Sequence, residues 1–263
     1  MIATGPHATE RLALRRFTIA DAANLLSLDG DPQVMRFLTG TTMSLAQIRD
    51  EVLPDLAGCH LRFPGFGYWA AETLTGGEFI GWFGLRPVMP TDGPIEDWPD
   101  ARGPAGVASL GYRLRRSAWG QGYATEGARA LVRLAFAGFG VREVVATTMA
   151  VNTGSRRVME KAGLRHARTV HLDWPEPLDG NEHGDVEYRL LREEWLKLCA
   201  TTARQAAPPP DSGDPGVSQE RPPPPPWPPP GSRPAAGGRG TTRRRACRRL
   251  RCRTALPRTS RTR

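Results

Sequence analysis

The sequence is poor in cysteine, and its four cysteines lack metal-binding spacing. Cys59, Cys199, Cys247 and Cys252 form no CxxC pair, and no histidine cluster accompanies them. This spacing argues against both a zinc site and a disulfide framework. We therefore expect no metal cofactor and a reducing, cytoplasmic compartment.

Long apolar segments are also missing. The N-terminus has no apolar core typical of a signal peptide, and the charged residues Glu10 and Arg11 come early. No run of about twenty apolar residues occurs, so we expect no membrane-spanning helix and no membrane partner.

Residues 204–263 contain no lysine, although they are strongly basic. They hold fourteen arginines against three acidic residues, and fourteen of the chain's 25 prolines. This segment therefore carries +11, and because the whole chain carries +9, residues 1–203 carry −2. The basicity of the chain thus says nothing about an active-site cleft. Proline runs adopt extended polyproline II and build no packed core, so we predict a disordered tail.

Two interpretations of this tail compete. A basic arm is attracted to nucleic acid and other acidic surfaces. Alternatively, the tail has no selected function, since proline, arginine, alanine and glycine all use GC-rich codons. The second interpretation is favoured, and nucleic acid is not an expected partner.

Residues 1–203 are predicted to form one α/β domain with enough apolar residues for a core of ordinary size. Apolar alternation, β-branched runs and the turn residues Gly76 and Gly77 indicate strands, whereas helical spacing of apolar residues indicates helices. Strands are expected near 12–15, 68–74, 78–85, 107–114, 143–151 and 186–190, and helices near 20–28, 44–56, 125–139 and 152–163. The intervening segment 86–106 is rich in proline, glycine and aspartate and is predicted to be an exposed loop.

The most informative segment is WGQGYATE, residues 119–126. It lies between the strand predicted at 107–114 and the helix predicted at 125–139. The first N–H groups of a helix have no partner within the helix and can all point at one anion. Glycine allows the backbone to approach that anion closely. The segment therefore predicts a phosphate or pyrophosphate cradle.

Four segments together resemble the GNAT N-acetyltransferases, and within them the Rim-type branch that includes ribosomal-protein N-terminal acetyltransferases. They are TERLALR (9–15), SLGYRL (109–114), WGQGYATE (119–126) and NTGSRRVMEKAGL (152–164), in the order of the family. The resemblance implies an α/β (α+β) fold. It has a mixed, mostly antiparallel central sheet flanked by helices, in which the strands near 107–114 and 144–151 splay apart.

The resemblance also implies acetyl-CoA as the acetyl donor, bound without a metal. Its pyrophosphate would lie on the backbone N–H groups of the turn, at Gln121, Gly122, Tyr123, Ala124 and Thr125. The pantetheine arm would pair with the strand at Tyr112, Arg113 and Leu114. In family terms, Asn152 contacts this arm and Ser155 lies near the thioester sulfur.

Two positions depart from the family pattern. Many relatives have a glutamate base where this chain has Ser109, and a general-acid tyrosine where it has Met159. The attacking amine must lose a proton and the departing thiolate must gain one. Ser155 is the expected substitute donor. The base candidates are Glu187, Asp185 and a water held by Ser109.

For several other residues, the sequence allows a functional and a structural interpretation. Glu126, in the first helical turn, is expected to complement the helix dipole rather than to act in catalysis. Arg115 and Arg116 either meet the 3′-phosphate of the cofactor or are solvated. His183 either touches the acceptor or is a surface residue, and Trp69, Trp82 and Trp174 are expected in the core or at its rim.

The sequence therefore predicts an N-acetyltransferase acting on a primary amine, which is either a protein N-terminus or a small molecule. The alternative is a degenerate domain that binds CoA as a sensor or scaffold, which Ser109 and Met159 favour. A monomer or a homodimer is expected.

Overall fold

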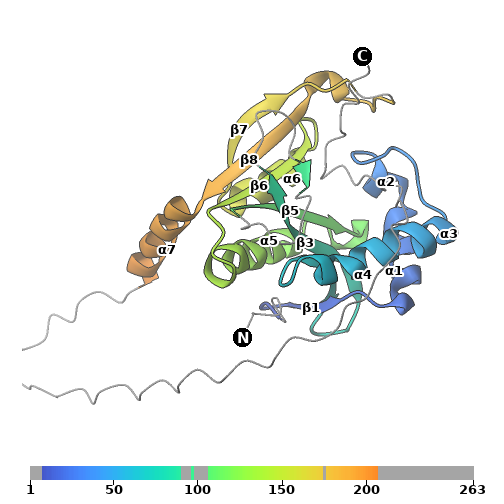
Figure 1. Ribbon diagram of the computed structural model, residues 1–263, viewed down its shortest axis with the longest axis horizontal. Helices are drawn as coiled ribbons and strands as arrows, with labels where there is room; N and C mark the ends of the chain where they lie inside the picture. The colour runs from blue at the N-terminus through green and yellow to red at the C-terminus, as the bar shows by residue number, and fades with distance from the viewer. Residues whose placement is uncertain (1–7, 90–95, 98–105, 174–175, 207–263) are drawn as a thin grey trace, which may run out of the picture.

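The computed structural model describes residues 8–89, 96–97, 106–173 and 176–206 (Figure 1). Trp174 and residues 207–263 of the predicted disordered tail lie outside the described residues, whereas residues 204–206 are helical. The last described helix, α7, runs over Arg192–Ala206 and so continues three residues past the predicted domain boundary at 203.

One mixed sheet forms the centre of the fold, and its strands follow the order β1-β2-β3-β5-β6-β8-β7. The described pairs are antiparallel except for β5 and β6, which run parallel. The strands are β1 (Leu12–Arg16), β2 (Gly67–Thr73), β3 (Phe79–Met89), β5 (Val107–Leu114), β6 (Glu143–Met149), β7 (Arg165–Val170) and β8 (Asp185–Leu191), with the short β4 (Glu96–Asp97) paired to β3. The predicted mixed, mostly antiparallel sheet is confirmed.

The parallel strands β5 and β6 separate after a short paired stretch. Their register covers only the pairs Val107↔Glu143, Ala108↔Val144 and Ser109↔Val145. Beyond these pairs, β5 continues to Leu114 and β6 to Met149 without pairing to each other. The predicted splayed strand pair is therefore present, and the edges that face each other beyond residue 109 offer backbone groups to a third partner.

Helices from the N-terminal part of the chain cover one face of the sheet, on the right of Figure 1. A continuous helical run begins at Ser44 with a capping box. The Ser44 hydroxyl accepts from the backbone N–H of Gln47, and the Gln47 side chain accepts from the backbone N–H of Ser44. This run passes the predicted end at residue 56 and reaches Arg62. The elements are η1 (Ile19–Asp21), α1 (Ala22–Asp29), α2 (Pro32–Met35), α3 (Leu45–Gln47), η2 (Ile48–Val52) and α4 (Leu53–Arg62).

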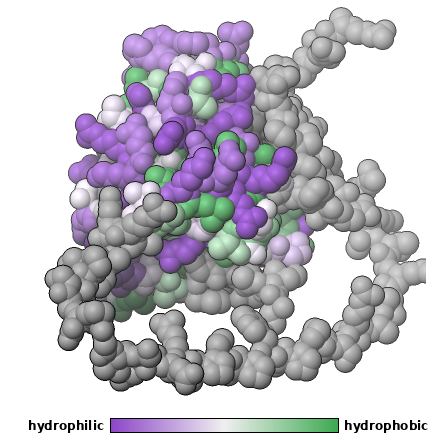
Figure 2. Space-filling view, turned by 90° about the vertical axis from the view of Figure 1, so that its left-hand side faces the viewer, coloured by the Kyte–Doolittle hydropathy of each residue, from purple (hydrophilic) through white to green (hydrophobic). Residues whose placement is uncertain are grey.

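Two helices cover the opposite face, and their apolar sides form the larger core. Helix α5 (Tyr123–Arg133) continues into η4 (Leu134–Gly138), and α6 (Thr153–Lys161) follows β6. Ala128, Leu131 and Phe136 are fully buried against the sheet, as their helical spacing predicts. The α5 and α7 side of the molecule is mostly hydrophilic, with hydrophobic residues in small groups (Figure 2).

The structure corrects the prediction of one exposed loop over 86–106. Strand β3 extends through residues 86–89, and residues 96–97 pair with it as β4. Pro87 fits this strand although its nitrogen donates no hydrogen bond. The remainder of the predicted loop lies outside the described residues.

Candidate active site

The predicted cradle is a glycine-containing turn that leads into α5. The chain leaves β5, makes a short helix η3 (Arg116–Ala118) and reaches α5 through Gly120 and Gly122, whose φ angles are +74° and +85°. Both angles lie in the left-handed region that favours glycine. The N-cap of α5 is Gly122, which has no side chain to cap the first turn, and the first N–H groups of a helix have no partner within the helix. The residues proposed for the pyrophosphate, Gln121 to Thr125, are all in this turn.

A clamp from the N-terminal segment holds this turn, and local sequence spacing gave no sign of it. The carboxylate of Glu126 accepts hydrogen bonds from Thr9 Oγ1 (2.5 Å), Arg11 N (2.8 Å) and Arg11 Nε (2.7 Å). Arg11 Nη1 also donates to the carbonyl of Gln121 at 3.0 Å, and its guanidinium lies 4.5 Å from the centre of the Tyr123 ring. Burial alone would raise the pKa of Glu126, but the bonds from Thr9 and Arg11 outweigh it and lower that pKa.

Glu126 is therefore an anchor of the turn as well as an acidic residue in the first helical turn. Its charge is neutralised by Arg11, which removes much of the repulsion that a bound anion would otherwise meet.

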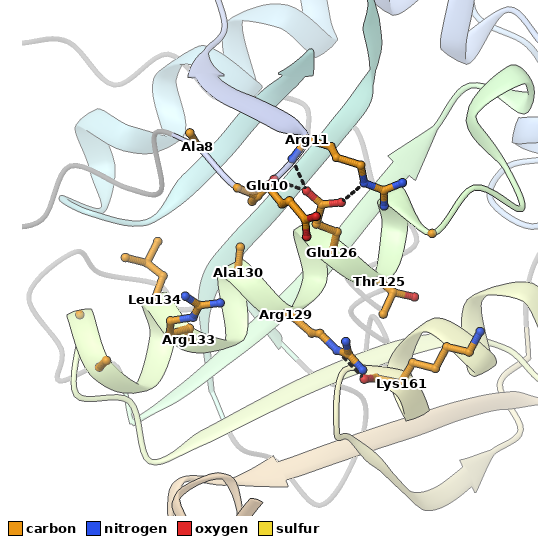
Figure 3. A pocket seen from close by; sticks show the side chains of 14 residues that line it. Ala8, Glu10, Arg11, Thr125, Glu126, Arg129, Ala130, Arg133, Leu134 and Lys161 are labelled. Atoms are coloured by element: carbon orange, nitrogen blue, oxygen red, sulfur yellow. Dashed lines mark hydrogen bonds and ion pairs between the residues drawn. The ribbon is translucent and has the colours of Figure 1, made fainter. Parts of the chain in front are cut away.

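A groove of about 970 Å³ runs beside this clamp along the outer side of α5 (Figure 3). The N-terminal segment from Ala8 to Arg11 forms one wall, and Gly122 and Thr125 connect the groove to the cradle. Its basic side chains are Arg11, Arg129, Arg133 and Lys161. Arg129 Nε donates to the carbonyl of Lys161 at 2.9 Å, which links α5 to the end of α6.

The two arginines before the cradle lie differently from each other. Arg115 Nη1 donates to the carbonyl of Phe79 at 3.0 Å and lies 3.5 Å from Glu78, so its guanidinium is held at the start of β3. Arg116 is exposed. Trp119 is about half exposed, and its indole N–H donates to the carbonyl of Leu114 at 2.8 Å. This bond fixes the turn against the end of β5.

The unpaired part of β5 carries the residues proposed for the pantetheine arm. Tyr112 and Leu114 face α5 and α6, whereas the side chain of Arg113 points to the other face. There the buried Arg113 guanidinium donates to the buried Asp29 carboxylate at 2.6 Å. Contact of Arg113 with a cofactor would therefore come from its backbone.

A hydrogen-bonded group joins the separated ends of β5 and β6. The Tyr112 hydroxyl lies 2.9 Å from Ser155 Oγ and donates to the Ser155 carbonyl at 3.0 Å. Asn152 caps α6 by accepting from Ser155 N at 3.1 Å, and its Nδ2 donates to Thr148 Oγ1 at 3.1 Å. The structure thus brings Tyr112, Asn152 and Ser155 together where β5 and β6 have separated.

The base candidates lie on the opposite face of the sheet. Ser109 is buried in the paired part of β5, three residues before Tyr112, and strand alternation turns it away from the Tyr112 face. Glu187 on β8 is 2% exposed and accepts from Arg168 Nη2 at 3.0 Å and from Arg189 Nε. Asp185 begins the same strand. His183 is exposed beside Glu182.

Met159, which stands where many relatives have a tyrosine, is part of the core. Its side chain is 2% exposed and packs in the cluster with Leu164 and Tyr188. It therefore leaves the site without a proton donor from that position of α6.

Residues 11–165 match the family described as Acetyltransferase (GNAT) domain. The chain belongs to the GNAT acetyltransferase family. An Aspergillus fumigatus protein named FsC-acetyl coenzyme A-N(2)-transacetylase is 38% identical over 173 residues, which cover 66% of this chain and 70% of that protein. The uncharacterized protein YkkB of Bacillus subtilis is 31% identical over 171 residues, covering 65% and 90%.

Solved structures have the same fold at lower identity. The ribosomal L7/L12 alpha-N-protein acetyltransferase RimL in complex with coenzyme A has a TM-score of 0.54 and 21% identity, covering 71% of this chain and 96% of RimL. The aminoglycoside acetyltransferase AAC(6')-Ib in complex with coenzyme A has a TM-score of 0.53 and 23% identity, covering 71% and 98%. These likenesses show that the chain has the fold of both proteins, and one of the two, RimL, is of the Rim type.

The protein is an acetyl-CoA-dependent N-acetyltransferase of the GNAT family. The uncapped first turn of α5 and the unpaired edges of β5 and β6 suit the phosphates and the amide groups of that donor. Within the described residues, no group of histidine, cysteine, aspartate or glutamate has the arrangement of a metal site. In the same residues, no helix has the length and apolarity needed to cross a membrane.

Proposed function

We propose that this acetyltransferase acts on the primary amine of a small molecule. The observation that carries the proposal is the relative from Aspergillus fumigatus, whose name specifies transfer from acetyl-CoA to a nitrogen designated N(2). It is 38% identical, whereas the N-terminal acetyltransferase RimL is only 21% identical. The alternative acceptor is a protein N-terminal amine.

In this proposal the donor lies on the α5 and α6 side of the sheet. The N–H groups of Gln121 to Thr125 hold the pyrophosphate, and the unpaired edge from Tyr112 to Leu114 pairs with the pantetheine arm. The uncapped first turn of α5 and the separation of β5 from β6 support both assignments. The groove beside the cradle is then the place for the nucleotide end, with Arg129 and Lys161 among its basic lining residues.

The acceptor then approaches from the face that carries Ser109 and Glu187. Holding amine and thioester together supplies most of the acceleration, up to about 7–11 kcal/mol. We assign Glu187, whose carboxylate lies on this face between Arg168 and Arg189, the role of collecting the amine proton through water. Ser109 would orient that water. Arg168 and Arg189 are partly exposed on the same face and would attract an acidic group on the acceptor.

A thiol-release screen tests this proposal. The full-length protein and acetyl-CoA are mixed with small amines, amino-sugar antibiotics and N-terminal peptides, and free CoA is measured. The proposal predicts release with a class of small amine and none with the peptides. Release only with peptides would assign the protein N-terminal amine instead. Binding of acetyl-CoA with no release from any acceptor would favour a sensor.

A further inference from the structure

The site needs a proton donor for the departing thiolate, and α6 does not supply one at the usual position. Met159 has no proton to give and is buried in the core. The proton must therefore reach the sulfur by another route, and the first turn of α6 contains the hydroxyl of Ser155. Tyr112 on β5 is the ionisable side chain that hydrogen bonds to Ser155 in that turn.

The Tyr112 phenol spans the gap between the two separated strands. It starts from the part of β5 that has lost its pairing with β6, and it ends on the hydroxyl and carbonyl of Ser155. Two acceptors within 3.0 Å share its single proton. When that proton lies toward Ser155 Oγ, the serine proton is free to point into the cleft. Burial raises the pKa of Tyr112 above its ordinary value, against a smaller opposing effect of Ser155, so the phenol keeps its proton at neutral pH.

Neighbouring polar groups have fixed partners. Arg156 donates to the carbonyl of Ala150 at 3.0 Å and to the Tyr188 hydroxyl at 3.2 Å. Asn152 is held between Thr148 and the Ser155 N–H. The Tyr112–Ser155 pair is therefore the arrangement in this part of the cleft best placed to release a proton.

We propose that Tyr112 is a positioning residue that delivers a proton through Ser155 to the sulfur of the departing CoA. This inference rests on the proposed function and on the family resemblance, which implies that Ser155 lies near the thioester sulfur. In it, Ser155 on α6 protonates the sulfur, and Tyr112 on β5 supplies the proton that Ser155 gives up.

The step balances as follows. The neutral amine forms the C–N bond to the carbonyl carbon, and the C–S bond breaks with its electron pair going to sulfur. Sulfur takes the proton of Ser155 Oγ, and Ser155 takes the proton of the Tyr112 hydroxyl. The amine nitrogen releases one proton to water on the acceptor face, and solvent returns a proton to Tyr112. The products are the amide, the CoA thiol and the original side chains.

A double-mutant cycle tests whether Tyr112 acts through Ser155. Tyr112→Phe, Ser155→Ala and the double variant are compared with wild type, and Tyr68→Phe is the matched control because it removes a buried phenol two strands away. We expect Ser155→Ala to lower kcat about 100-fold and Tyr112→Phe by somewhat less, within the range of general acid catalysis. The double variant should match Ser155→Ala. An unchanged kcat for Tyr112→Phe, or a further loss in the double variant, would overturn the relay.

A binding measurement gives a readout that needs no acceptor. Calorimetry compares CoA with desulfo-CoA, which lacks the sulfur. A hydrogen-bond donor at the sulfur should give wild type and Tyr68→Phe about tenfold tighter binding of CoA, and Ser155→Ala should lose this preference while still binding acetyl-CoA. The same preference in Ser155→Ala as in wild type would remove the relay and leave the transferase assignment intact. Failure of wild type to bind either compound would instead remove the proposed cofactor site.

Discussion

At the scale of single residues, Glu126 holds the glycine-containing turn that leads into α5. Its carboxylate joins the first turn of α5 to Thr9 and Arg11, which lie 117 and 115 positions away in the sequence. Because Arg11 also binds the carbonyl of Gln121, the clamp reaches the backbone that is proposed to face the pyrophosphate. Loss of the Glu126 charge should therefore affect both stability and cofactor affinity.

We expect Glu126→Gln to lower the free energy of unfolding by about 1 kcal/mol, since Arg11 is half exposed and solvent screens the pair. The pKa of Glu126 is lowered in the folded protein. Its stabilisation is thus present above the ordinary glutamate pKa of about 4.3 and is lost as the pH falls through the folded pKa. Thermal unfolding from neutral to acidic pH checks this: the two melting curves should converge in acid.

Glu78→Gln is the control for this variant, because Glu78 is exposed and its ion pair with Arg115 is long, at 3.5 Å. It should change the melting temperature little. Equal melting temperatures of Glu126→Gln and wild type at neutral pH would show that the clamp does not stabilise the turn.

At the scale of elements, α5 is set closely against the sheet by a glycine. A Cβ at Gly127 would lie 2.1 Å from the Phe83 ring of β3, so no larger residue fits without displacing that ring. Gly58 in α4 is a useful contrast, since nothing lies within 4 Å of a Cβ built there. The distance between α5 and the sheet also sets the position of the cradle at the start of α5.

Gly127→Ala should therefore destabilise the protein by about 1–3 kcal/mol through overpacking. Gly58→Ala should stabilise it by up to about 1 kcal/mol, because alanine favours the helix. Denaturant unfolding of both variants checks this contrast. Stabilisation by Gly127→Ala would mean that α5 and Phe83 are not packed as described.

Much of the element pattern was predictable from the sequence, for physical reasons that differ between elements. Strand β5 lies where its apolar and β-branched residues predict it, and α6 begins at its asparagine cap. Strand β7 was not predicted because Arg165, His166 and Ala167 are all exposed, so apolar alternation is absent. Helix α7 also lacked a prediction.

The candidate site was predictable only in part. Gly120 and Gly122 were identified by their position between a predicted strand and a predicted helix, and the structure shows a left-handed backbone at both, which was not predicted. The contact of Arg11 with the turn joins residues 110 positions apart, and the Tyr112–Ser155 contact joins residues 43 positions apart. Local patterns do not encode such contacts, which depend on how the sheet is assembled.

At the scale of the whole molecule, the residues proposed for the acetyl donor and those proposed for the acceptor lie on opposite faces of the sheet. The cradle, the groove and the Tyr112–Ser155 pair lie on the α5 and α6 side, whereas Ser109, Glu187 and their arginine partners lie on the other side. Beyond Ser109 and Val145, β5 and β6 are not paired to each other. In the proposed function, donor and acceptor meet there from opposite faces, with the proton donor and the proton acceptor kept apart.

The account assigns no part of this site to residues 207–263. We expect a variant ending at Ala206, which retains all of α7, to bind acetyl-CoA with the affinity of the full chain. Its nucleic-acid binding should be lower, because residues 207–263 carry +10 and residues 1–206 carry −1 of the chain's net charge of +9. Calorimetry and a salt-dependent gel-shift assay check the two statements. Weaker acetyl-CoA binding by the shortened chain would give the tail a role in the site.

The most direct test of the central claim is calorimetric titration of acetyl-CoA into wild type, Gly122→Val and Gly77→Val. Both variants place valine at a glycine with positive φ, but Gly77 lies in the β2–β3 hairpin away from the cradle. The account predicts that wild type and Gly77→Val bind acetyl-CoA with equal affinity, and that Gly122→Val loses at least about tenfold, the equivalent of one charge-assisted hydrogen bond. Equal binding by all three proteins, or no binding by wild type, would contradict the placement of the pyrophosphate at the start of α5.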